Sequence, residues 1–394
     1  MRILVLSFYY SPDLCAGSFR TTALVQALLE LLPENSHIEV ITTLPNRYSS
    51  FSNEAPDVEE LPRLTIRRIK LPPHHSGMVD QSKAFVTYAR QVSRLVRHGE
   101  YNLVYGTSSR LMTAVLSACV VRRKGLPLYL DIRDIFVDTI KDVLPSKMAV
   151  LAKPFFSLVE RWTISRAQKV NLVSRGFEGY FTSRYPQQNY SYFTNGIDDE
   201  FLVAREAGSK TSKKSGQPLT ILYAGNIGDG QGMHAIVPEL AKRLEGRVRF
   251  RVIGDGGRKD RLKSRLREMG CVNVELLSPV KRDELLQEYR QADVLFLHLN
   301  NYPAFLKVLP SKLFEYAATG KPVWAGVAGY AAEFVRAEIK NAVVFPPCVV
   351  DEAVRVLGEL KMEEVDRTEF NEKFARKNIV RNMAMDICSV LSNV

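Results

Sequence analysis

The residues best suited to bind a phosphorylated ligand follow predicted strands in the second half of the chain. The loop AGNIGDGQGM comes after the predicted strand 219–223, carries Gly225, Asn226 and Gln231, and leads into a helix predicted from about residue 233. Glycines let backbone N–H groups approach a phosphate, and a helix N-terminus adds partial positive charge. A tight turn between strand and helix would need the same glycines, so this loop alone is weak evidence.

A second glycine turn, VIGDGGRKDRL, follows the next predicted strand. Gly254 begins the turn, and Arg258 and Lys259 come directly after it. Cations beside a glycine turn suit a diphosphate. The alternative is an ordinary solvated first turn of a helix.

The third loop, NNYPAFLKVLPS, contains Lys307 and ends in the helix SKLFEYAATG. Ser311 is a good N-cap, and Lys312 and Glu315 share one helical face. A capping box would place its carboxylate one residue earlier, so capping does not explain Glu315. A carboxylate here can accept two hydrogen bonds from a vicinal diol. The alternative is a salt bridge from Glu315 to Lys312 or Lys321.

Two loops of the first half carry similar groups. YYSPDLCAGSFR follows the first predicted strand, and its Gly17 and Arg20 lie in the first turns of the next helix. YLDIRDIFVD ends a later strand with four charged residues: Asp131, Arg133, Asp134 and Asp138. Carboxylates at this position can orient an acceptor hydroxyl or act as a base. The alternative is an Asp–Arg pair that braces the loop.

Metal chemistry finds no support in the sequence. The chain has no Asp-x-Asp pair, HExxH, Walker motif or GxSxG. The five cysteines lie far apart without a CxxC, which indicates isolated thiols in a reducing compartment. We therefore expect no metal site and no cofactor.

Strand-like and helix-like segments alternate along both halves, which predicts parallel sheets covered by helices. The predicted strands are 2–8, 38–43, 64–70, 103–105, 128–131, 169–173, 190–193, 219–223, 248–253, 274–276, 294–297, 322–324 and 342–345. GSKTSKKSGQP, residues 208–218, reads as a basic linker between two such halves. In open parallel sheets, ligands bind beyond the carboxyl ends of the strands. The loops described above follow those ends.

The composition is that of a globular protein with a formal net charge of +11. The positive charge favours anionic partners without choosing among them. The apolar start of the chain, residues 3–10, is followed at once by Asp13 and is expected to be a buried strand. The apolar run LMTAVLSACVV is too short to span a bilayer, so we expect no transmembrane segment and a cytoplasmic location.

The five loops above, together with TNGID (residues 194–198), occur in an order that resembles glycosyltransferase family 4: YYSPDLCAGSFR, DIRDIFVD, TNGID, YAGNIGDGQG, VIGDGGRKDRL and LPSKLFEYAATGKPV. The resemblance implies an α/β protein of the GT-B fold, with two Rossmann-like doubly wound domains facing across a cleft. We place an acceptor-binding domain at residues 1–200 and a nucleotide-sugar domain at 201–365. A helical segment at 366–394 is expected to pack back toward the first domain.

The resemblance also implies residue roles. Glu315 matches the glutamate that bonds the donor ribose, Ser311 and Lys312 lie where backbone amides meet the diphosphate, and Arg258 or Lys259 matches a basic position near the phosphates. Gly225, Asn226, Gln231 and Gly254 would line the donor side. Gly17, Arg133 and Asp134 match the loops around the reacting sugar, with Arg20, Asp131 and Asp138 on the acceptor side. The chain departs from the family at Lys307, which replaces the first glutamate, and at Asn226, where many relatives have Arg.

The implied reaction is the metal-independent transfer of a sugar, with retained anomeric configuration, from a nucleotide diphosphate to an acceptor. The resemblance is to the branch that builds bacterial surface polysaccharides, often from amino-sugar donors. We expect a UDP-sugar donor and a saccharide or lipid-linked saccharide acceptor, with no nucleic acid partner. Lys83, Arg90, Arg94 and Arg97 fall on one face of a predicted helix, a pattern that suits the inner membrane surface or an ordinary solvated face.

Two other functions fit the same fold. A sugar-nucleotide 2-epimerase would need acid–base groups around the sugar, and His234 and His298 are the useful candidates. A non-catalytic nucleotide-sugar binder, acting as a partner subunit, is the second alternative, and Lys307 in place of glutamate favours it.

Overall fold

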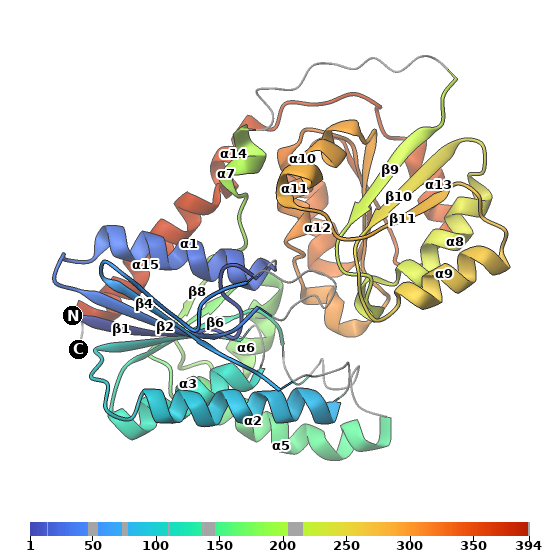
Figure 1. The fold of residues 1–394 in the computed structure, drawn as a ribbon. Coiled ribbons are helices and arrows are strands. Elements are labelled where there is room, and N and C mark those ends of the chain that lie inside the picture. Colours follow the sequence, from blue (N-terminus) through green and yellow to red (C-terminus); the bar gives the residue numbers. More distant parts are fainter. Residues whose placement is uncertain are drawn as a thin grey trace. The chain divides into compact units, whose positions relative to one another are not determined.

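The computed structural model describes residues 1–13, 15–45, 54–72, 78–108, 111–135, 137, 146–203 and 216–392. The chain forms two compact units (Figure 1). Unit 1 contains Met1–Asn195 and Arg376–Val394, and unit 2 contains Gly196–Ala375. The chain therefore passes between the units at residues 195/196 and 375/376, where the sequence analysis placed boundaries at 200/201 and 365/366.

Unit 1 is a helix-covered sheet. Its elements are β1 (Arg2–Leu6), α1 (Ala16–Leu31), β2 (His37–Thr43), β3 (Val58–Leu61), β4 (Leu64–Ile69), α2 (Met78–Leu95), β5 (Leu103–Thr107), α3 (Leu111–Lys124), β6 (Leu128–Ile132), α5 (Ser146–Ile164), β7 (Lys169–Leu172), η1 (Arg175–Phe177), α6 (Glu178–Arg184), β8 (Tyr190–Ser191) and α15 (Arg376–Ser392).

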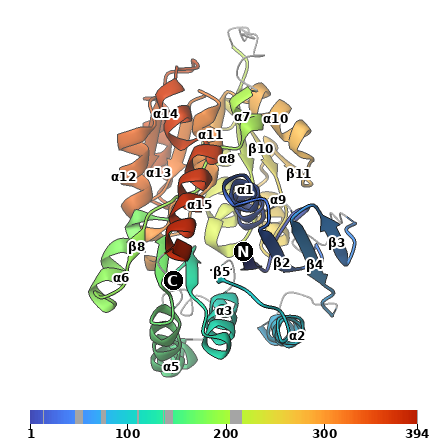
Figure 2. The ribbon, with the colours of Figure 1, turned by 90° about the vertical axis from the view of Figure 1, so that its left-hand side faces the viewer.

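The sheet of unit 1 has the strand order β3-β4-β2-β1-β5-β6-β7-β8. All pairings are parallel except that of the edge strand β3 with β4. The strands read as apolar runs because helices cover both faces. α1 and α15 lie on one face, and α2, α3 and α5 lie on the other (Figures 1 and 2). The core under the first pair joins residues from both ends of the chain, including Leu24, Leu28, Met383 and Ile387.

Unit 2 repeats the alternation. Its elements are α7 (Asp199–Val203), β9 (Leu219–Ala224), η2 (Asp229–Gln231), α8 (Met233–Arg243), β10 (Val248–Ile253), α9 (Lys259–Glu268), β11 (Val274–Leu277), α10 (Arg282–Gln291), β12 (Val294–His298), η3 (Pro303–Lys307), α11 (Lys312–Ala318), β13 (Val323–Gly326), α12 (Gly329–Glu338), β14 (Ala342–Phe345), α13 (Val350–Leu357) and α14 (Thr368–Phe374).

The sheet of unit 2 is parallel, with the order β11-β10-β9-β12-β13-β14. α8, α9 and α13 cover one face, and α10, α11 and α12 cover the other (Figure 1). Trp324 lies in the core and donates its indole N–H to the carbonyl oxygen of Ala353 at 3.0 Å. The strand order reverses between β9 and β12, so the loops after these two strands leave the same edge side by side. Such switch points are the usual ligand sites of open parallel sheets.

The structure confirms the predicted α/β class with two doubly wound parallel sheets. Strand β3 was not predicted, because Val58–Leu61 is exposed and half acidic. The predicted linker at 208–218 lies mostly outside the described residues. Within the described part of the chain, no helix has both the length and the apolar character needed to cross a membrane.

Candidate active site

The switch point of unit 2 brings the first glycine loop against the loop after β12. The backbone N–H of Asn300 donates to the Gly230 carbonyl oxygen at 2.8 Å, and the Asn300 side chain donates to the Asp229 carbonyl oxygen at 3.0 Å. Gly232 adopts a φ of +60°, the left-handed conformation that glycine favours, as the chain enters α8. The loop that follows β12 therefore fixes the position of the first glycine loop.

His298, the last residue of β12, has both ring nitrogens occupied. Nδ1 lies 2.7 Å from the Gln231 carbonyl oxygen, and Nε2 accepts the backbone N–H of Cys348 at 3.0 Å. These contacts require Nδ1 to carry the proton. Burial lowers the pKa of His298 to about 4, although the bond to Gln231 opposes this shift. The neutral imidazole thus links the first glycine loop to the loop after β14 through two hydrogen bonds.

The two glycine loops approach each other at Gly254. A side chain at this position would place its Cβ 1.8 Å from the carbonyl oxygen of Gly225, so only glycine fits. The Lys259 side chain donates to the Gly254 carbonyl oxygen at 2.9 Å. The predicted donor residues Gly225, Gly254 and Lys259 therefore lie together.

Arg258 joins the second glycine turn to the first loop. Its Nε donates to Asp229 Oδ1 at 2.7 Å, and the Tyr302 hydroxyl donates to Asp229 Oδ2 at 2.7 Å. The bond from Tyr302, together with the Arg258 guanidinium, holds the pKa of Asp229 below its ordinary value. Arg258 is half-buried, and the Asp229 carboxylate in the first glycine loop orients its side chain.

Asn226 and Gln231 shape the inside of the first glycine loop. Asn226 Nδ2 donates to Gln231 Oε1 at 2.9 Å, and the same oxygen accepts the Gly228 N–H at 3.2 Å. The Tyr223 hydroxyl also donates to the Asn226 carbonyl oxygen. The hydrogen bonds of the Asn226 and Gln231 side chains are therefore made within the loop, and both residues help to fix the conformation of the loop.

Glu315 lies one turn into α11 and is buried, with 8% of its surface exposed. Its carboxylate accepts Lys312 Nζ at 2.8 Å and the Tyr289 hydroxyl at 3.0 Å. The salt bridge to Lys312 that the sequence left open is therefore present. Burial and the Glu315 charge raise the pKa of Tyr289 well above its ordinary value, so its hydroxyl stays a donor.

The beginning of α11 also lies beside the first glycine loop, since a Cβ on Gly225 would come within 3.7 Å of Lys312 Cε. Ser311 occupies the N-cap position, but its backbone is already helical and its side chain makes no cap hydrogen bond, so the predicted capping role is wrong. Lys307 is the last residue of η3 and is half-buried.

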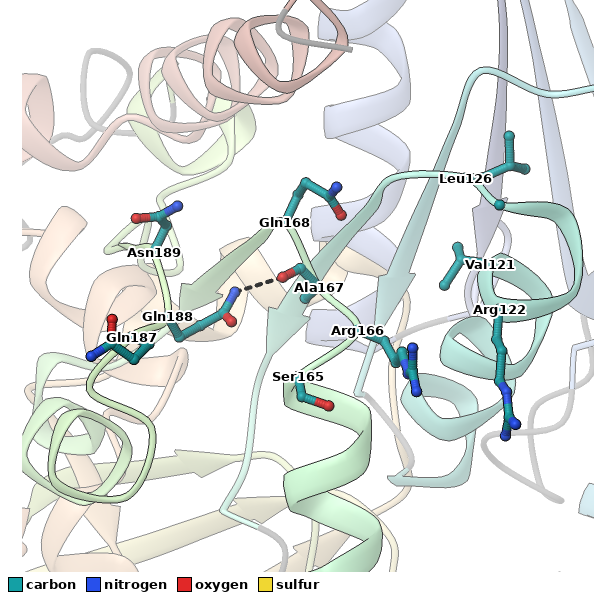
Figure 3. A pocket seen from close by; sticks show the side chains of 11 residues that line it. Val121, Arg122, Leu126, Ser165, Arg166, Ala167, Gln168, Gln187, Gln188 and Asn189 are labelled. Carbon is teal, nitrogen blue, oxygen red and sulfur yellow. Dashed lines mark hydrogen bonds between the residues drawn. The ribbon is translucent and has the colours of Figure 1, made fainter.

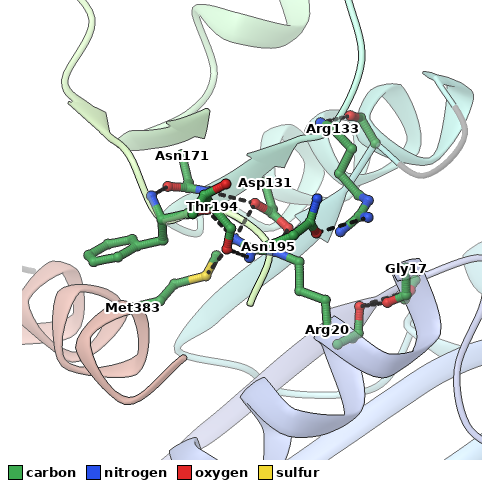
Figure 4. A network of polar contacts seen from close by, with 12 residues as sticks. Gly17, Arg20, Asp131, Arg133, Asn171, Thr194, Asn195 and Met383 are labelled. Atoms are coloured by element: carbon green, nitrogen blue, oxygen red, sulfur yellow. Dashed lines mark hydrogen bonds and ion pairs between the residues drawn. The ribbon is translucent and has the colours of Figure 1, made fainter. Parts of the chain in front are cut away.

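In unit 1, Arg20 and Asp131 form a buried ion pair (Figure 4). Arg20 Nε donates to Asp131 Oδ2 at 2.8 Å, and Asp131 also accepts the Tyr105 hydroxyl and the Asn171 amide. The other guanidinium nitrogens of Arg20 donate to the carbonyl oxygens of residues 193 and 194. Burial would raise the pKa of Asp131, but the charge and hydrogen bonds of Arg20, together with the Arg133 charge and the Asn171 amide, hold that pKa below its ordinary value.

The burial of this pair corrects the prediction that Arg20 and Asp131 lie on the acceptor side. Arg20 and Asp131 have exposed fractions of 1% and 0%, so neither presents a surface to an acceptor. Each charge is balanced by its protein partners. The sequence left open an Asp–Arg pair that braces the loop; the pair that forms joins α1 to the end of β6 and to residues 193 and 194. Asp138, the third expected acceptor-side residue, lies outside the described residues.

The remaining candidates of unit 1 follow β1 and β6. The Arg133 N–H donates to Ser108 Oγ at 2.8 Å, and its side chain contacts Asn195 Oδ1 at 3.5 Å (Figure 4). Arg133 Nη1 is buried and hydrogen-bonds to no described residue. Asp134 is exposed, and Gly17 is buried in the first turn of α1. Arg133 and Asp134 thus stay available for a ligand at the end of β6.

Possible metal ligands do not gather in the described residues. No three side chains of the His, Cys, Asp and Glu types lie together there in a group that could hold an ion. The cationic groups around the glycine loops are Arg258, Lys259 and Lys312, all of them half-buried.

Comparison with known families divides the chain in two. The model of glycosyl transferases group 1 matches residues 204–378, and the model of the glycosyl transferase 4-like domain matches residues 21–196. Together they cover most of the chain, and each falls largely within one of the two units. The chain belongs to the group 1 glycosyltransferases.

Individual relatives of this glycosyltransferase are distant. The putative colanic acid biosynthesis glycosyl transferase WcaI of Escherichia coli (strain K12) is 25% identical over 352 residues, covering 81% of this chain and 82% of that protein. Sucrose-phosphate synthase from Thermosynechococcus elongatus has a TM-score of 0.73 at 15% identity, with both chains fully covered. HepE of Anabaena, solved in complex with UDP, has a TM-score of 0.65 at 15% identity, covering 99% of this chain and 100% of that one. The predicted GT-B fold is confirmed.

Several residues that shape the candidate site of this glycosyltransferase were not predicted from the sequence. Asp229, Tyr302 and Asn300 hold the glycine loop, and Tyr289 orients Glu315. Asn300 and Tyr302 follow a predicted strand end, which is a usable signal. Tyr289 lies in the amphipathic helix α10, where no local pattern distinguishes it. His298 was considered as an acid–base group for an epimerase, but both of its nitrogens are engaged by backbone groups.

Proposed function

We propose that this glycosyltransferase moves a sugar from a UDP-sugar to a saccharide or lipid-linked saccharide, with retention of the anomeric configuration. The observation that carries the donor assignment is the position of Glu315 and Lys312 beside Gly225 at the switch point of unit 2. A buried carboxylate, a lysine and two glycine loops supply the groups that a ribose and a diphosphate need. That HepE was solved with UDP supports the choice of nucleotide.

The diphosphate is bound without a metal in this proposal. Lys312, Arg258 and Lys259, together with the N–H groups of the glycine loops, stabilise the negative charge that develops on the leaving group. Lys307 adds a further cation after β12. The acceptor hydroxyl attacks the anomeric carbon from the face that the phosphate leaves, and the departing phosphate oxygen takes its proton.

The acceptor is assigned to unit 1. Arg133 and Asp134 follow β6 at a strand end, and Arg133 has a buried nitrogen without a described partner. We assign them to the orientation of the acceptor and of the transferred sugar, with Gly17 near the reacting centre. The name of the E. coli relative supports a place in bacterial surface polysaccharide synthesis. An N-acetylated amino sugar is our proposal for the transferred group, on the family resemblance.

We also propose peripheral contact with an anionic membrane surface on the cytoplasmic side. Lys83, Arg90, Arg94 and Arg97 are exposed on or just after α2. On α5, which covers the same face of the sheet, Phe155 and Leu158 are exposed to 64% and 66%. Apolar side chains flanked by cations suit a layer of anionic headgroups.

Thermal melting with nucleotide sugars in EDTA tests the donor assignment. UDP or a UDP-sugar at about 100 times its dissociation constant should stabilise the folded protein by about 2.7 kcal/mol. Transfer to a lipid-linked acceptor, with retention established by NMR of the product, should persist in EDTA. Activity that disappears with EDTA and returns with Mn²⁺ would contradict metal independence, and isomerisation of the free UDP-sugar would favour the epimerase.

Vesicle sedimentation tests the membrane surface. Vesicles with anionic lipids should bind the protein, and binding should weaken with salt and in the Arg90→Gln/Arg94→Gln variant. Arg249→Gln/Arg267→Gln in unit 2 is the matched control for the loss of two charges. Equal binding by neutral and anionic vesicles would contradict the proposed surface.

A further inference from the structure

A polar pocket lies at the edge of unit 1 where the strands begin. It is lined by residues of three segments, 121–126 at the end of α3, 165–168 before β7 and 187–189 before β8, and its volume is about 550 Å³ (Figure 3). β6, β7 and β8 are parallel, so their first residues lie at the opposite edge from Arg133 and Asp134. This strand-start pocket is therefore separate from the candidate active site.

Two arginines give the strand-start pocket its charge. Arg122 and Arg166 are exposed, and neither forms an ion pair with a described residue. Figure 3 shows their side chains extending in the same direction from neighbouring segments. No carboxylate lines the pocket. Basic residues at a helix C-terminus complement its dipole, which accounts for Arg122 at the end of α3. Arg166 lies two residues past the end of α5 and contacts the Trp162 ring, but neither the helix dipole nor that contact accounts for the hollow between the two arginines.

Amide side chains form the opposite side. Gln187, Gln188 and Asn189 line the pocket from the loop before β8. Gln188 Nε2 donates to the Ala167 carbonyl oxygen at 2.8 Å, which fixes that side chain (Figure 3). The backbone is fixed as well, because the Asn189 carbonyl oxygen accepts the Val170 N–H at 2.9 Å. Amides both donate and accept hydrogen bonds, as the hydroxyl groups of a sugar do.

We propose that the strand-start pocket binds an acidic saccharide, with its carboxylate on Arg122 and Arg166 and its hydroxyl groups on the amides. Guanidinium groups are suited to bidentate binding of carboxylates. The volume lies within the range of small-molecule sites. The choice of a saccharide rests on the proposed function, since a polysaccharide-building enzyme meets glycan chains. A second site at the far edge of unit 1 would hold such a chain while the reaction proceeds elsewhere.

Trp162 offers a direct signal for binding. The Arg166 guanidinium carbon lies 5.9 Å from the centre of the Trp162 ring, so a ligand that draws Arg166 away changes the surroundings of the indole. The other tryptophan, Trp324, is fully buried in unit 2 and gives a constant background. Titration of the full-length protein with trigalacturonate should give a saturable fluorescence change. The change should be absent in Trp162→Phe.

Matched variants assign the signal to the pocket. Affinity for trigalacturonate should fall at least tenfold in Arg122→Gln and in Arg166→Gln, and should stay unchanged in Arg123→Gln, the exposed neighbour of Arg122 outside the pocket. Melting with UDP should give the same shift in all of these variants. Because UDP binding tests the proposed function separately, its failure and the failure of the pocket proposal are distinguishable.

Three results would overturn the proposal. Neutral maltotriose that binds as tightly as trigalacturonate would remove the role of the arginines. Inorganic phosphate that competes at equal concentration would show an anion site without sugar recognition. Anionic vesicles that lose as much affinity in Arg166→Gln as trigalacturonate does would assign the guanidinium groups to a lipid surface.

Discussion

At the scale of single residues, Glu315 shows how a salt bridge and a binding role can coincide. Lys312 and Tyr289 each use the carboxylate oxygen Oε2. A carboxylate has about four lone-pair sites, so two partners leave room for a diol. The two contacts fix the carboxylate at the beginning of α11, where reorientation on binding would otherwise cost free energy. The bridge is thus compatible with the proposed role.

Substitution of Glu315 tests that role. Glu315→Ala should weaken UDP-sugar binding about 10- to 100-fold, because a hydrogen bond to a charged group contributes about 1.5–3 kcal/mol. Tyr289→Phe removes only an orienting contact and should cost less. Calorimetric titration with UDP measures both, and Glu333→Ala, an exposed glutamate on α12, is the control. Unchanged affinity in Glu315→Ala would remove the residue from the donor site.

His298 makes a separate prediction about pH. The pKa of His298 is lowered to about 4 in the folded protein, from a reference value of 6.5. Between these values the unfolded chain takes up a proton that the folded protein does not, so stability falls as the pH drops from 6.5 to 4. The shift corresponds to about 3 kcal/mol.

His298→Gln isolates this effect, because its amide can still donate to the Gln231 carbonyl oxygen and accept the Cys348 N–H. The free energy of unfolding, measured with urea at pH 7 and pH 4.5, should fall with acidification by about 2–3 kcal/mol more in the natural protein than in the variant. Other groups titrate alike in both proteins. Parallel pH profiles would show that His298 does not remain neutral in the fold.

At the scale of elements, the Arg20–Asp131 pair joins four parts of unit 1. It links α1 to the end of β6, reaches the carbonyl oxygens before residue 195, and brings Arg20 Nη2 to Met383 Sδ on α15 at 3.2 Å (Figure 4). A buried ion pair is weak evidence for net stabilisation, but removal of one partner leaves an uncompensated charge.

Arg20→Met should therefore destabilise unit 1 by about 3–5 kcal/mol. The double variant Arg20→Met/Asp131→Asn should recover part of that loss, because the buried negative charge is removed. Urea unfolding followed by circular dichroism measures both, and UDP binding by unit 2 reports whether the effect is confined to unit 1. A loss below about 1 kcal/mol in the single variant would show that water or another cation compensates Asp131.

Sequence patterns predicted most of the elements and the loops that form the proposed donor site. Apolar runs and glycine turns are local signals, and the loops carrying Gly225, Gly254 and Glu315 follow strands that were placed within a few residues. Partnerships across the chain were not predictable, because Arg20 and Asp131 are 111 positions apart. Arg20 was predicted to lie on the acceptor side, at the beginning of a helix, although its environment is set by three other segments.

At the scale of the whole molecule, α15 connects the end of the described chain to its beginning. Val380, Met383, Ala384, Ile387 and Val390 belong to the same core as α1 and the first strands. The chain passes between the units twice, and the two ends of unit 2 lie close together: the Ile197 N–H donates to the Phe374 carbonyl oxygen at 2.8 Å. Unit 1 is therefore discontinuous in sequence, and unit 2 is continuous.

Truncation after Ala375 should affect the units unequally. Removal of α15 uncovers apolar residues of unit 1, such as Leu24 and Leu28, so its unfolding transition should move to lower temperature or disappear. Unit 2 keeps its whole core and should still be stabilised by UDP in a melting experiment. A truncated chain with both transitions unchanged would contradict the role given to α15 in the core.

The same discontinuity sets an order of events during synthesis. Domains usually fold as they emerge, the N-terminal one first. Here the earlier-made unit lacks part of the cover on one face of its sheet until α15 has been translated, whereas the later-made unit is complete as soon as residue 375 is free. The nascent chain consequently exposes apolar surface on unit 1 while unit 2 is being synthesised. A chaperone that binds exposed apolar surface would act during this interval.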